Sequence, residues 1–176
     1  MILTGSQIVE EVRRGRIVID PFDEAAINPN SYNFTLSDTF RVYACDVIDT
    51  RKENPTELIR MIDRELILQP GRLYLAVTRE RIGSNHYAPT YAARSSVARL
   101  GMFINLSAPL GDIGFVGRWT LQLYCLHPIR VYEGMRIGQM MFWRPSGRIE
   151  LYHGKYQGAS GPMASQIYKD VQKQFA

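Results

Sequence analysis

The sequence predicts a mainly β protein, a distorted β-barrel or jelly roll with a few short helices. Apolar and polar residues alternate over many short segments, as they do in strands with one buried face. Glycine, proline and asparagine separate these segments at short intervals, which is typical of a sandwich or barrel. With 176 residues, 45% of them hydrophobic and 22% charged, the chain is expected to form a single domain over residues 1–176 with a sizeable core.

The first element expected is a helix. Thr4–Gln7 has the spacing of a helix-capping box, and an apolar stripe over Ile8–Val12 follows before Arg13–Gly15 ends it. A short strand over 16–19 and a loop over 21–29 come next. The alternating pattern then predicts strands over residues 32–36, 40–43 and 47–48.

A short helix is expected over Glu57–Ile62. Asn54 suits an N-cap, Pro55 suits the first helical turn, and Glu57 places a negative charge there. Beyond residue 66 nearly every expected element is a strand, and a last short helix is expected within 163–174. These strands are expected over residues 66–68, 73–77, 102–104, 119–124, 137–142 and 149–151.

Composition and motifs exclude several classes of function. The net charge of +4 is spread along the chain, which suits an anionic ligand but does not indicate nucleic-acid binding. There is no membrane-spanning apolar run and no signal-peptide pattern, so a cytoplasmic protein is expected. His86, His127 and His153 lie in no zinc-binding pattern, and Walker A, GxGxxG and GxSxG motifs are missing. Cys45 and Cys125 are expected to be reduced thiols.

The strongest candidate for binding chemistry is the segment Arg94–Arg99, which reads Arg-Ser-Ser-Val-Ala-Arg. Arginine presents a planar fork of donors to phosphate oxygens, and the free N–H groups of a helix start also favour an anion. Together with Lys155, these arginines and hydroxyls suit a polyphosphate. The spacing alone equally fits a solvated turn before a helix whose apolar face is Val97 and Leu100.

This segment, continued by Leu100-Gly101-Met102-Phe103, resembles the central motif of the dCTP deaminase/dUTPase family, in its deaminase-like branch. Further blocks resemble the same family in chain order, namely Leu68–Gly71, Tyr74–Thr78, Asp112–Gly117, Gly134–Gln139, Gly154–Tyr156 and Ser165–Asp170. The resemblance covers almost the whole chain. It implies a homotrimer with active sites shared between subunits and a C-terminal tail, residues 154–176, that acts as a lid. The implied substrate is a pyrimidine nucleoside triphosphate that carries Mg²⁺ on its phosphates, so the protein itself supplies no metal ligand.

The resemblance also implies roles for individual residues. Those that would bind substrate on the phosphate, sugar or base side are Arg94, Ser96, Ala108, Gln139, Lys155 and Tyr156. Those in catalytic positions are Ser95, Arg99, Asp112 and Gln122. Ser95 would lie near the base and its attacking water, and Asp112 matches the aspartate that faces the deoxyribose in dUTPases and helps to activate the hydrolytic water.

Three positions depart from the deaminase pattern. Gln122 stands where that branch has a glutamate that takes a proton from the water attacking C4 and passes it to the leaving amine, and an amide cannot do this. Ala159 stands where the tail has a glutamine that reads the base, and Asn33 stands where aspartate is preferred. Three explanations of Gln122 stay open: it is an ordinary polar strand residue, it is an engineered substitution of glutamate, or the chemistry of this chain has diverged from deamination.

Asp112 leaves phosphate-side chemistry open. A carboxylate at a turn, beside Mg²⁺-bound phosphates, can orient water for attack on the α-phosphorus, although Asp followed two residues later by Gly is also common in simple turns. The sequence therefore predicts a hydrolase of pyrimidine nucleotide metabolism, with dUTPase-type hydrolysis as the first candidate. The alternatives are a dCTP deaminase with an altered proton shuttle and a non-catalytic nucleotide-binding homologue.

Overall fold

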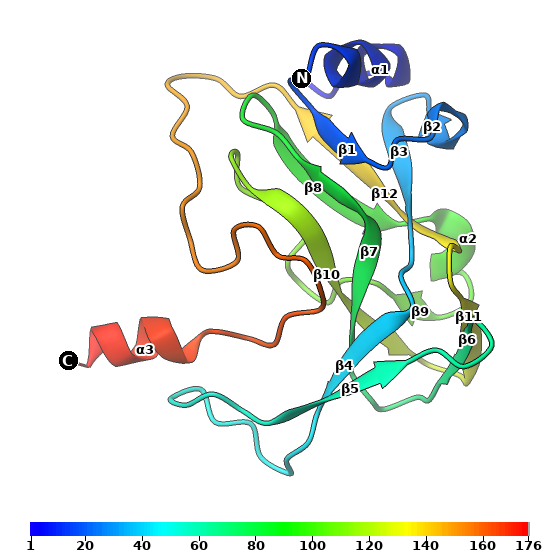
Figure 1. The fold of residues 1–176 in the computed structure, drawn as a ribbon, viewed down its shortest axis with the longest axis vertical. Helices are drawn as coiled ribbons and strands as arrows, with labels where there is room; N and C mark the ends of the chain where they lie inside the picture. The colour runs from blue at the N-terminus through cyan, green and yellow to red at the C-terminus, as the bar shows by residue number, and fades with distance from the viewer. Residues whose placement is uncertain (176) are drawn as a thin grey trace.

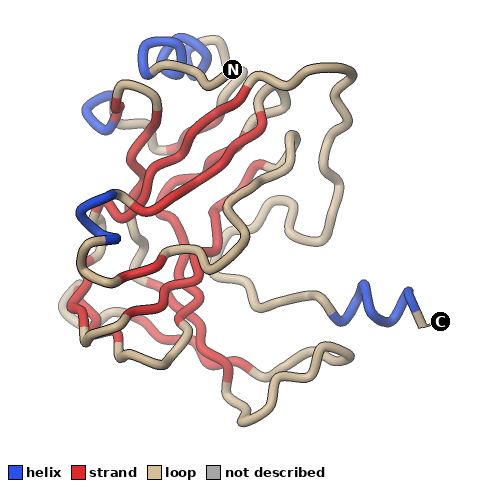
Figure 2. The backbone as a smooth tube through the Cα atoms, turned by 180° about the vertical axis from the view of Figure 1, so that it is seen from behind, coloured by secondary structure: helices blue, strands red, loops and turns tan. Residues whose placement is uncertain are grey.

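The computed structural model describes residues 1–175 and is built mainly of strands, with a few short helices. Figure 1 shows the strands curving around a common interior, with α1 (Gly5–Arg13) at one end. Both views show α3 (Tyr168–Gln174) standing clear of the strands, at the end of a long loop (Figures 1 and 2). This arrangement confirms the predicted jelly-roll-like β class.

The largest sheet has 6 strands, in the order β5-β4-β7-β10-β9, with β1 also paired to β7. Its strands are β1 (Val18–Asp20), β4 (Thr39–Tyr43), β5 (Thr56–Arg60), β7 (Tyr74–Gly83), β9 (Met102–Phe103) and β10 (Val116–Cys125). The long strands β7 and β10 pair antiparallel, with a register shift between Arg118 and Thr120. Burial alternates strictly along β10, so one face packs into the core and the other is left for a cavity.

A second sheet has 4 strands in the order β2-β3-β12-β8, and β11 pairs with β6 in a short ribbon. These strands are β2 (Ile27–Asn28), β3 (Ser31–Thr35), β6 (Glu65–Leu68), β8 (Ala88–Ala93), β11 (Ile129–Tyr132) and β12 (Arg136–Trp143). Fully buried side chains such as Phe34, Phe40, Leu121 and Phe142 form one core with residues of both larger sheets. Burial of large apolar side chains is the main source of stability in such a core.

The N-terminal helix α1 lies where the sequence predicts it, and a buried charge fixes it. Its Glu11 side chain is fully buried and accepts hydrogen bonds from Arg16 Nη2 at 2.6 Å and from Gln7 Nε2 at 2.8 Å. The bond to Arg16 is the main reason that the pKa of Glu11 falls to about 2. The helix is therefore held to the following loop by an ionised carboxylate.

The helix predicted over residues 57–62 is wrong. That segment is strand β5, whose Ile59 pairs with Phe40 of β4. Asn54 caps no helix, because its side-chain amide bonds the backbone of Asp49 and Lys52 within the preceding loop. Pairing with β4 thus overrides a local helix signal.

Other expectations hold in part. The strands predicted over residues 47–48 and 149–151 are loops, and the strands β8 and β11 were not predicted. The helix expected near the end of the chain is α3, and the helix expected to begin within Arg94–Arg99 is the short helix α2 (Ser95–Ala98).

Candidate functional site

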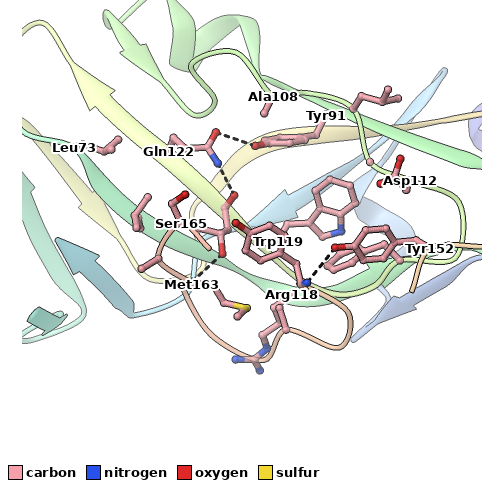
Figure 3. Close-up of a pocket in the computed structure, with 18 of the residues that line it drawn as sticks. Leu73, Tyr91, Ala108, Asp112, Arg118, Trp119, Gln122, Tyr152, Met163 and Ser165 are labelled. Atoms are coloured by element: carbon pink, nitrogen blue, oxygen red, sulfur yellow. Dashed lines mark hydrogen bonds between the residues drawn. The ribbon is translucent and has the colours of Figure 1, made fainter. Parts of the chain in front are cut away.

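A cavity of about 470 Å³ lies against the face of β10 that points away from the core. Its walls come from β10, from Tyr91 on β8, from Tyr43 on β4, from Leu73 and Leu75 at the start of β7, from the loop 108–115 and from the tail segment 152–165. Figure 3 shows Gln122 and Ser165 toward one end of the cavity and Asp112 and Tyr152 toward the other. Elements that are far apart in the sequence therefore enclose one space.

Gln122 lies on this face of β10 with its amide held in one orientation. Nε2 donates to the backbone oxygen of Thr120 at 3.1 Å, and the Tyr91 hydroxyl makes a longer donor contact to Oε1 at 3.5 Å. Turning the amide over would set its oxygen against the Thr120 carbonyl oxygen, so the arrangement is directional. Burial raises the pKa of Tyr91 to about 12, and its hydroxyl therefore stays a donor near neutral pH.

Asp112 begins a tight turn at the exposed edge of the cavity. Its backbone oxygen accepts from Phe115 N at 3.2 Å, and Gly114 has a φ of 97°, a conformation that favours glycine. Before the turn, Gly111 lies so close to Trp119 that a Cβ would meet the ring at 2.0 Å. The residue before Asp112 therefore packs directly against the Trp119 indole. Among the cavity-lining residues that the structure describes, Asp112 has the only carboxylate.

Aromatic rings form the wall between the two ends of the cavity. Trp119 contacts Phe115 and Tyr91 edge to face, with centroid distances of 5.2 Å and 5.4 Å, and Tyr152 from the tail contacts Phe115 at 6.1 Å. Such a wall suits a flat apolar ring, while polar groups at either end fix its orientation. The cavity is thus able to hold an aromatic ligand with Gln122 at one end and Asp112 at the other.

The tail covers the cavity mainly through its backbone. Ala159 O accepts from Arg118 N at 2.7 Å, and Met163 N donates to Thr120 Oγ1 at 3.0 Å. Ala159 lines the cavity with a methyl group alone, so this position offers no side-chain hydrogen bond to a ligand.

The structure brings together four of the predicted site residues, Ala108, Asp112, Gln122 and Tyr156. It places the other predicted residues outside the cavity, namely Arg94, Ser95, Ser96, Arg99, Gln139 and Lys155. The arginines and serines of this second group lie on or beside α2 and are half-buried or exposed. One copy of the chain therefore carries the two predicted halves of the site in different places.

Two of the outlying residues have partners within the chain. Gln139 on β12 accepts a hydrogen bond from Ser31 at 3.2 Å. Lys155 forms an ion pair with Asp170 of α3, which raises the pKa of Lys155, and its ammonium lies 5.7 Å from the centre of the Tyr156 ring. Lys155 would have to exchange this partner in order to bind a phosphate.

Sequence reasoning missed several residues of the cavity. Tyr91 and Trp119 hold the wall and the Gln122 amide, and Tyr152 packs beside the turn of Asp112. Alternation along residues 118–124 places Trp119 on the face opposite to Gln122, so it does not predict a cavity-lining ring there, and nothing local points to Tyr91.

The described part of the chain, residues 1–175, offers neither a cluster of metal ligands nor a membrane-spanning helix. No group of three or more histidine, cysteine or acidic side chains there could hold a metal ion. No helix within residues 1–175 combines the length and the apolar character needed to cross a membrane.

Comparisons with known proteins agree with the resemblance. The family model described as dCTP deaminase-like matches residues 2–145. A Clostridium beijerinckii protein named "dCTP deaminase, dUMP-forming" is 44% identical over 174 residues, covering 98% of this chain and 100% of that protein. A Cytophaga hutchinsonii protein of the same name is 41% identical over 174 residues, covering 98% of this chain and 100% of that protein.

One solved structure shares the fold. The 2'-deoxycytidine 5'-triphosphate deaminase from Agrobacterium tumefaciens matches 80% of this chain with a TM-score of 0.64 and 18% sequence identity. This chain spans 47% of the length of that one.

Proposed function

Because the chain belongs to the dCTP deaminase-like family, we propose that it hydrolyses a pyrimidine deoxynucleoside triphosphate at the phosphate side, releasing diphosphate, and leaves the base unchanged. The name of its relatives covers two reactions, since dCTP must lose both an amine and two phosphates to become dUMP. The proposal rests on the two polar side chains that lie at opposite ends of the cavity. The one carboxylate among its described lining residues is Asp112, and the opposite end carries the amide of Gln122.

The groups around Gln122 argue against deamination. Moving a proton from water to a leaving amine needs a side chain that ionises near neutral pH, and such general acid–base catalysis is worth about 10²–10⁴ in rate. The amide of Gln122 does not titrate, and the hydroxyl beside it belongs to Tyr91, whose pKa of about 12 keeps it protonated. This end of the cavity can therefore contact a base without exchanging protons with it.

Asp112 supports hydrolysis at the α-phosphorus. A carboxylate at the mouth of the cavity can accept a hydrogen bond from a water and align that water with the phosphorus. Mg²⁺ bound to the phosphate oxygens would neutralise the charge that develops there, and the substrate itself would be its main ligand. The work left to the chain is to hold the nucleotide and to place one water.

We also propose that the complete site joins two copies of the chain in a homotrimer. Arg94 and Arg99 beside α2 suit phosphate but lie outside the cavity of their own chain. Leu110 on the cavity-lining loop and Leu106 just before it are exposed, at 67% and 53%, as expected of a surface that a second copy covers. The α2 segment of one copy would thus complete the cavity of the next.

Mixing two inactive variants tests the shared site. Asp112→Asn damages the cavity, Arg99→Ala damages α2, and each chain keeps the half that the other lacks. After equimolar subunit exchange, about a quarter of the sites would contain both intact halves if subunits mix at random. Activity that stays at the level of the single variants after exchange would contradict a shared site.

The reaction is tested with the purified protein, Mg²⁺ and a panel of dUTP, dCTP, UTP and CTP, with diphosphate and ammonia measured in parallel. The proposal expects diphosphate from a deoxynucleotide, no ammonia, and a rate lower by about 10²–10⁴ in Asp112→Asn. Ammonia from dCTP would instead identify a deaminase with another proton shuttle. Tight binding of the nucleotides without either product would identify a non-catalytic homologue.

A further inference from the structure

We infer that Gln157 is a positioning residue that couples docking of the C-terminal tail to the placement of Asp112; this inference rests on the proposed function. Gln157 comes directly after Tyr156, which lines the cavity, but is itself not among the lining residues. Its side chain joins the tail to the turn that carries Asp112.

The Gln157 amide makes four contacts, all with backbone groups. Two of them reach the turn and the start of β10, where Nε2 donates to Gly114 O at 2.6 Å and Oε1 accepts from Val116 N, the first residue of β10, at 3.0 Å. The other two lie within the tail, where Nε2 donates to Tyr152 O at 3.2 Å and Oε1 accepts from Gly158 N at 3.1 Å. Both donor hydrogens and the oxygen of the amide are used, so the side chain clamps the tail against the turn.

Within the described chain, the turn has three other backbone anchors. On the tail side, Tyr152 N donates to Ile113 O at 2.8 Å. On the side of the body, Gly114 N donates to Ser84 O at 2.7 Å and Gly111 N donates to Pro89 O at 2.8 Å. The tail also packs so closely that a Cβ at Gly114 would meet Tyr152 N at 2.7 Å. When the tail leaves, the groups of the turn bonded by Gln157 and Tyr152 lose their partners, and the turn gains freedom.

This freedom matters because of what the turn carries. A group that orients an attacking water must be held to within a fraction of an ångström, and a misplacement of about 1 Å can lower the rate by about 10²-fold. Asp112 lies two residues before Gly114, so the bonds of Gln157 fix the far side of its turn, while Gly111 N, bonded to Pro89 O, fixes the near side. Docking of the tail therefore tightens the placement of the Asp112 carboxylate, which favours water activation in the closed site.

The experiment compares Gln157→Ala and Gln157→Glu with the parent protein. Gln157→Glu keeps the size of the side chain, but a carboxylate has no N–H to donate to the carbonyls of Gly114 and Tyr152. The matched control is Gln172→Ala on α3, whose amide makes one long contact, to Arg51 O at 3.4 Å. In diphosphate release from dUTP, both Gln157 variants are expected to lower kcat by about 10- to 10²-fold with KM within about threefold, and the control to leave both unchanged.

Trp119 gives a second readout that does not depend on activity. In a Trp143→Phe background it is the only tryptophan, and it packs against Phe115 and Gly111 of the turn region. A loosened turn exposes the indole, so acrylamide should quench Trp119 more strongly in Gln157→Ala than in the parent or in the Gln172→Ala control.

The outcomes separate this inference from the proposed function. A kcat within twofold of the parent, or a rise in KM with unchanged kcat, would overturn the coupling. If the parent releases no diphosphate from any nucleotide, the proposed function fails, and quenching alone decides the coupling. Stronger quenching then supports a clamp between tail and turn, and equal quenching in Gln157→Ala and the parent overturns it.

Discussion

Replacing Gln122 with glutamate should start the release of ammonia from dCTP and, at the same time, weaken the fold. The substitution puts a titratable group at the end of the cavity where the described chain has an amide between Thr120 and Tyr91. The Tyr91 hydroxyl can donate to a carboxylate oxygen as it does to Oε1. General acid–base catalysis contributes about 10²–10⁴ in rate, so ammonia release should rise from background by about that factor.

The structure also sets the loss of stability. Gln122 Nε2 donates to Thr120 O at 3.1 Å, and an ionised carboxylate can only turn an oxygen toward that carbonyl. Losing this hydrogen bond and leaving the carbonyl unpaired costs about 1–3 kcal/mol. For a chain of this size the loss corresponds to a fall in Tm of roughly 2–12 °C.

The loss of folding stability in Gln122→Glu should grow as the pH rises. Partial burial and the facing carbonyl raise the pKa of the introduced carboxyl above the value of about 4.3 that it has in the unfolded chain. Below that value the neutral acid can donate to Thr120 O and stability is close to that of the parent. Stability is then lost as the pH rises through the pKa of the folded state.

The assay measures ammonia from dCTP between pH 5 and 8, together with the Tm at each pH. Gln122→Met is the matched control, because it fills similar space without a titratable proton and should release no ammonia. The reasoning is refuted if Gln122→Glu folds, binds dCTP and releases no more ammonia than Gln122→Met. It is equally refuted if the parent protein already releases ammonia at the rate of the glutamate variant.

Three further perturbations follow from the described contacts. Asp170→Asn frees Lys155 from an exposed ion pair worth about 0.2–1 kcal/mol. The KM for the triphosphate should therefore fall by up to about fivefold in the diphosphate assay. An unchanged KM would show that Lys155 does not bind the phosphates. Because its pKa is lowered to about 2, the Glu11 carboxylate stabilises the fold above pH 4.5, and this stabilisation is lost toward pH 2. The difference in stability between the parent and Glu11→Gln, measured by circular dichroism, should therefore shrink as the pH falls over that range. Gly111→Ala puts a Cβ against Trp119 and should lower kcat by at least about tenfold, measured beside its Tm.

Local patterns predicted the strand that carries the site but not the groups around it. Alternation over residues 119–124 marks a half-buried strand and places Gln122 on the same face as Thr120, as in β10. Tyr91 lies on β8, whose sequence Ala-Pro-Thr-Tyr-Ala-Ala shows no clear alternation of apolar and polar residues. Pairing with β12 makes this segment a strand, and such a long-range contact leaves no local mark.

Two other results depended on contacts beyond the local sequence. The helix signals around Asn54 and Pro55 were valid locally, yet pairing of β5 with β4 decided the outcome. The resemblance grouped the residues of α2 with the cavity, but no pattern within one chain tells whether a single copy or two copies join them. The bond between Lys155 and Asp170 likewise requires the path of the tail to be known.

The backbone bonds of the tail have a consequence for how the cavity can change. Ala159 contributes its carbonyl oxygen to Arg118, and Met163 and Ser165 contribute their amides to Thr120 and Tyr43. Bonds of this kind survive almost any exchange of the side chain at the same position. Evolution or a designed library can therefore change the side chains of residues 159–165 that face the ligand while the backbone bonds that dock this segment are kept. Substitutions in this segment are a way to change which base the cavity accepts.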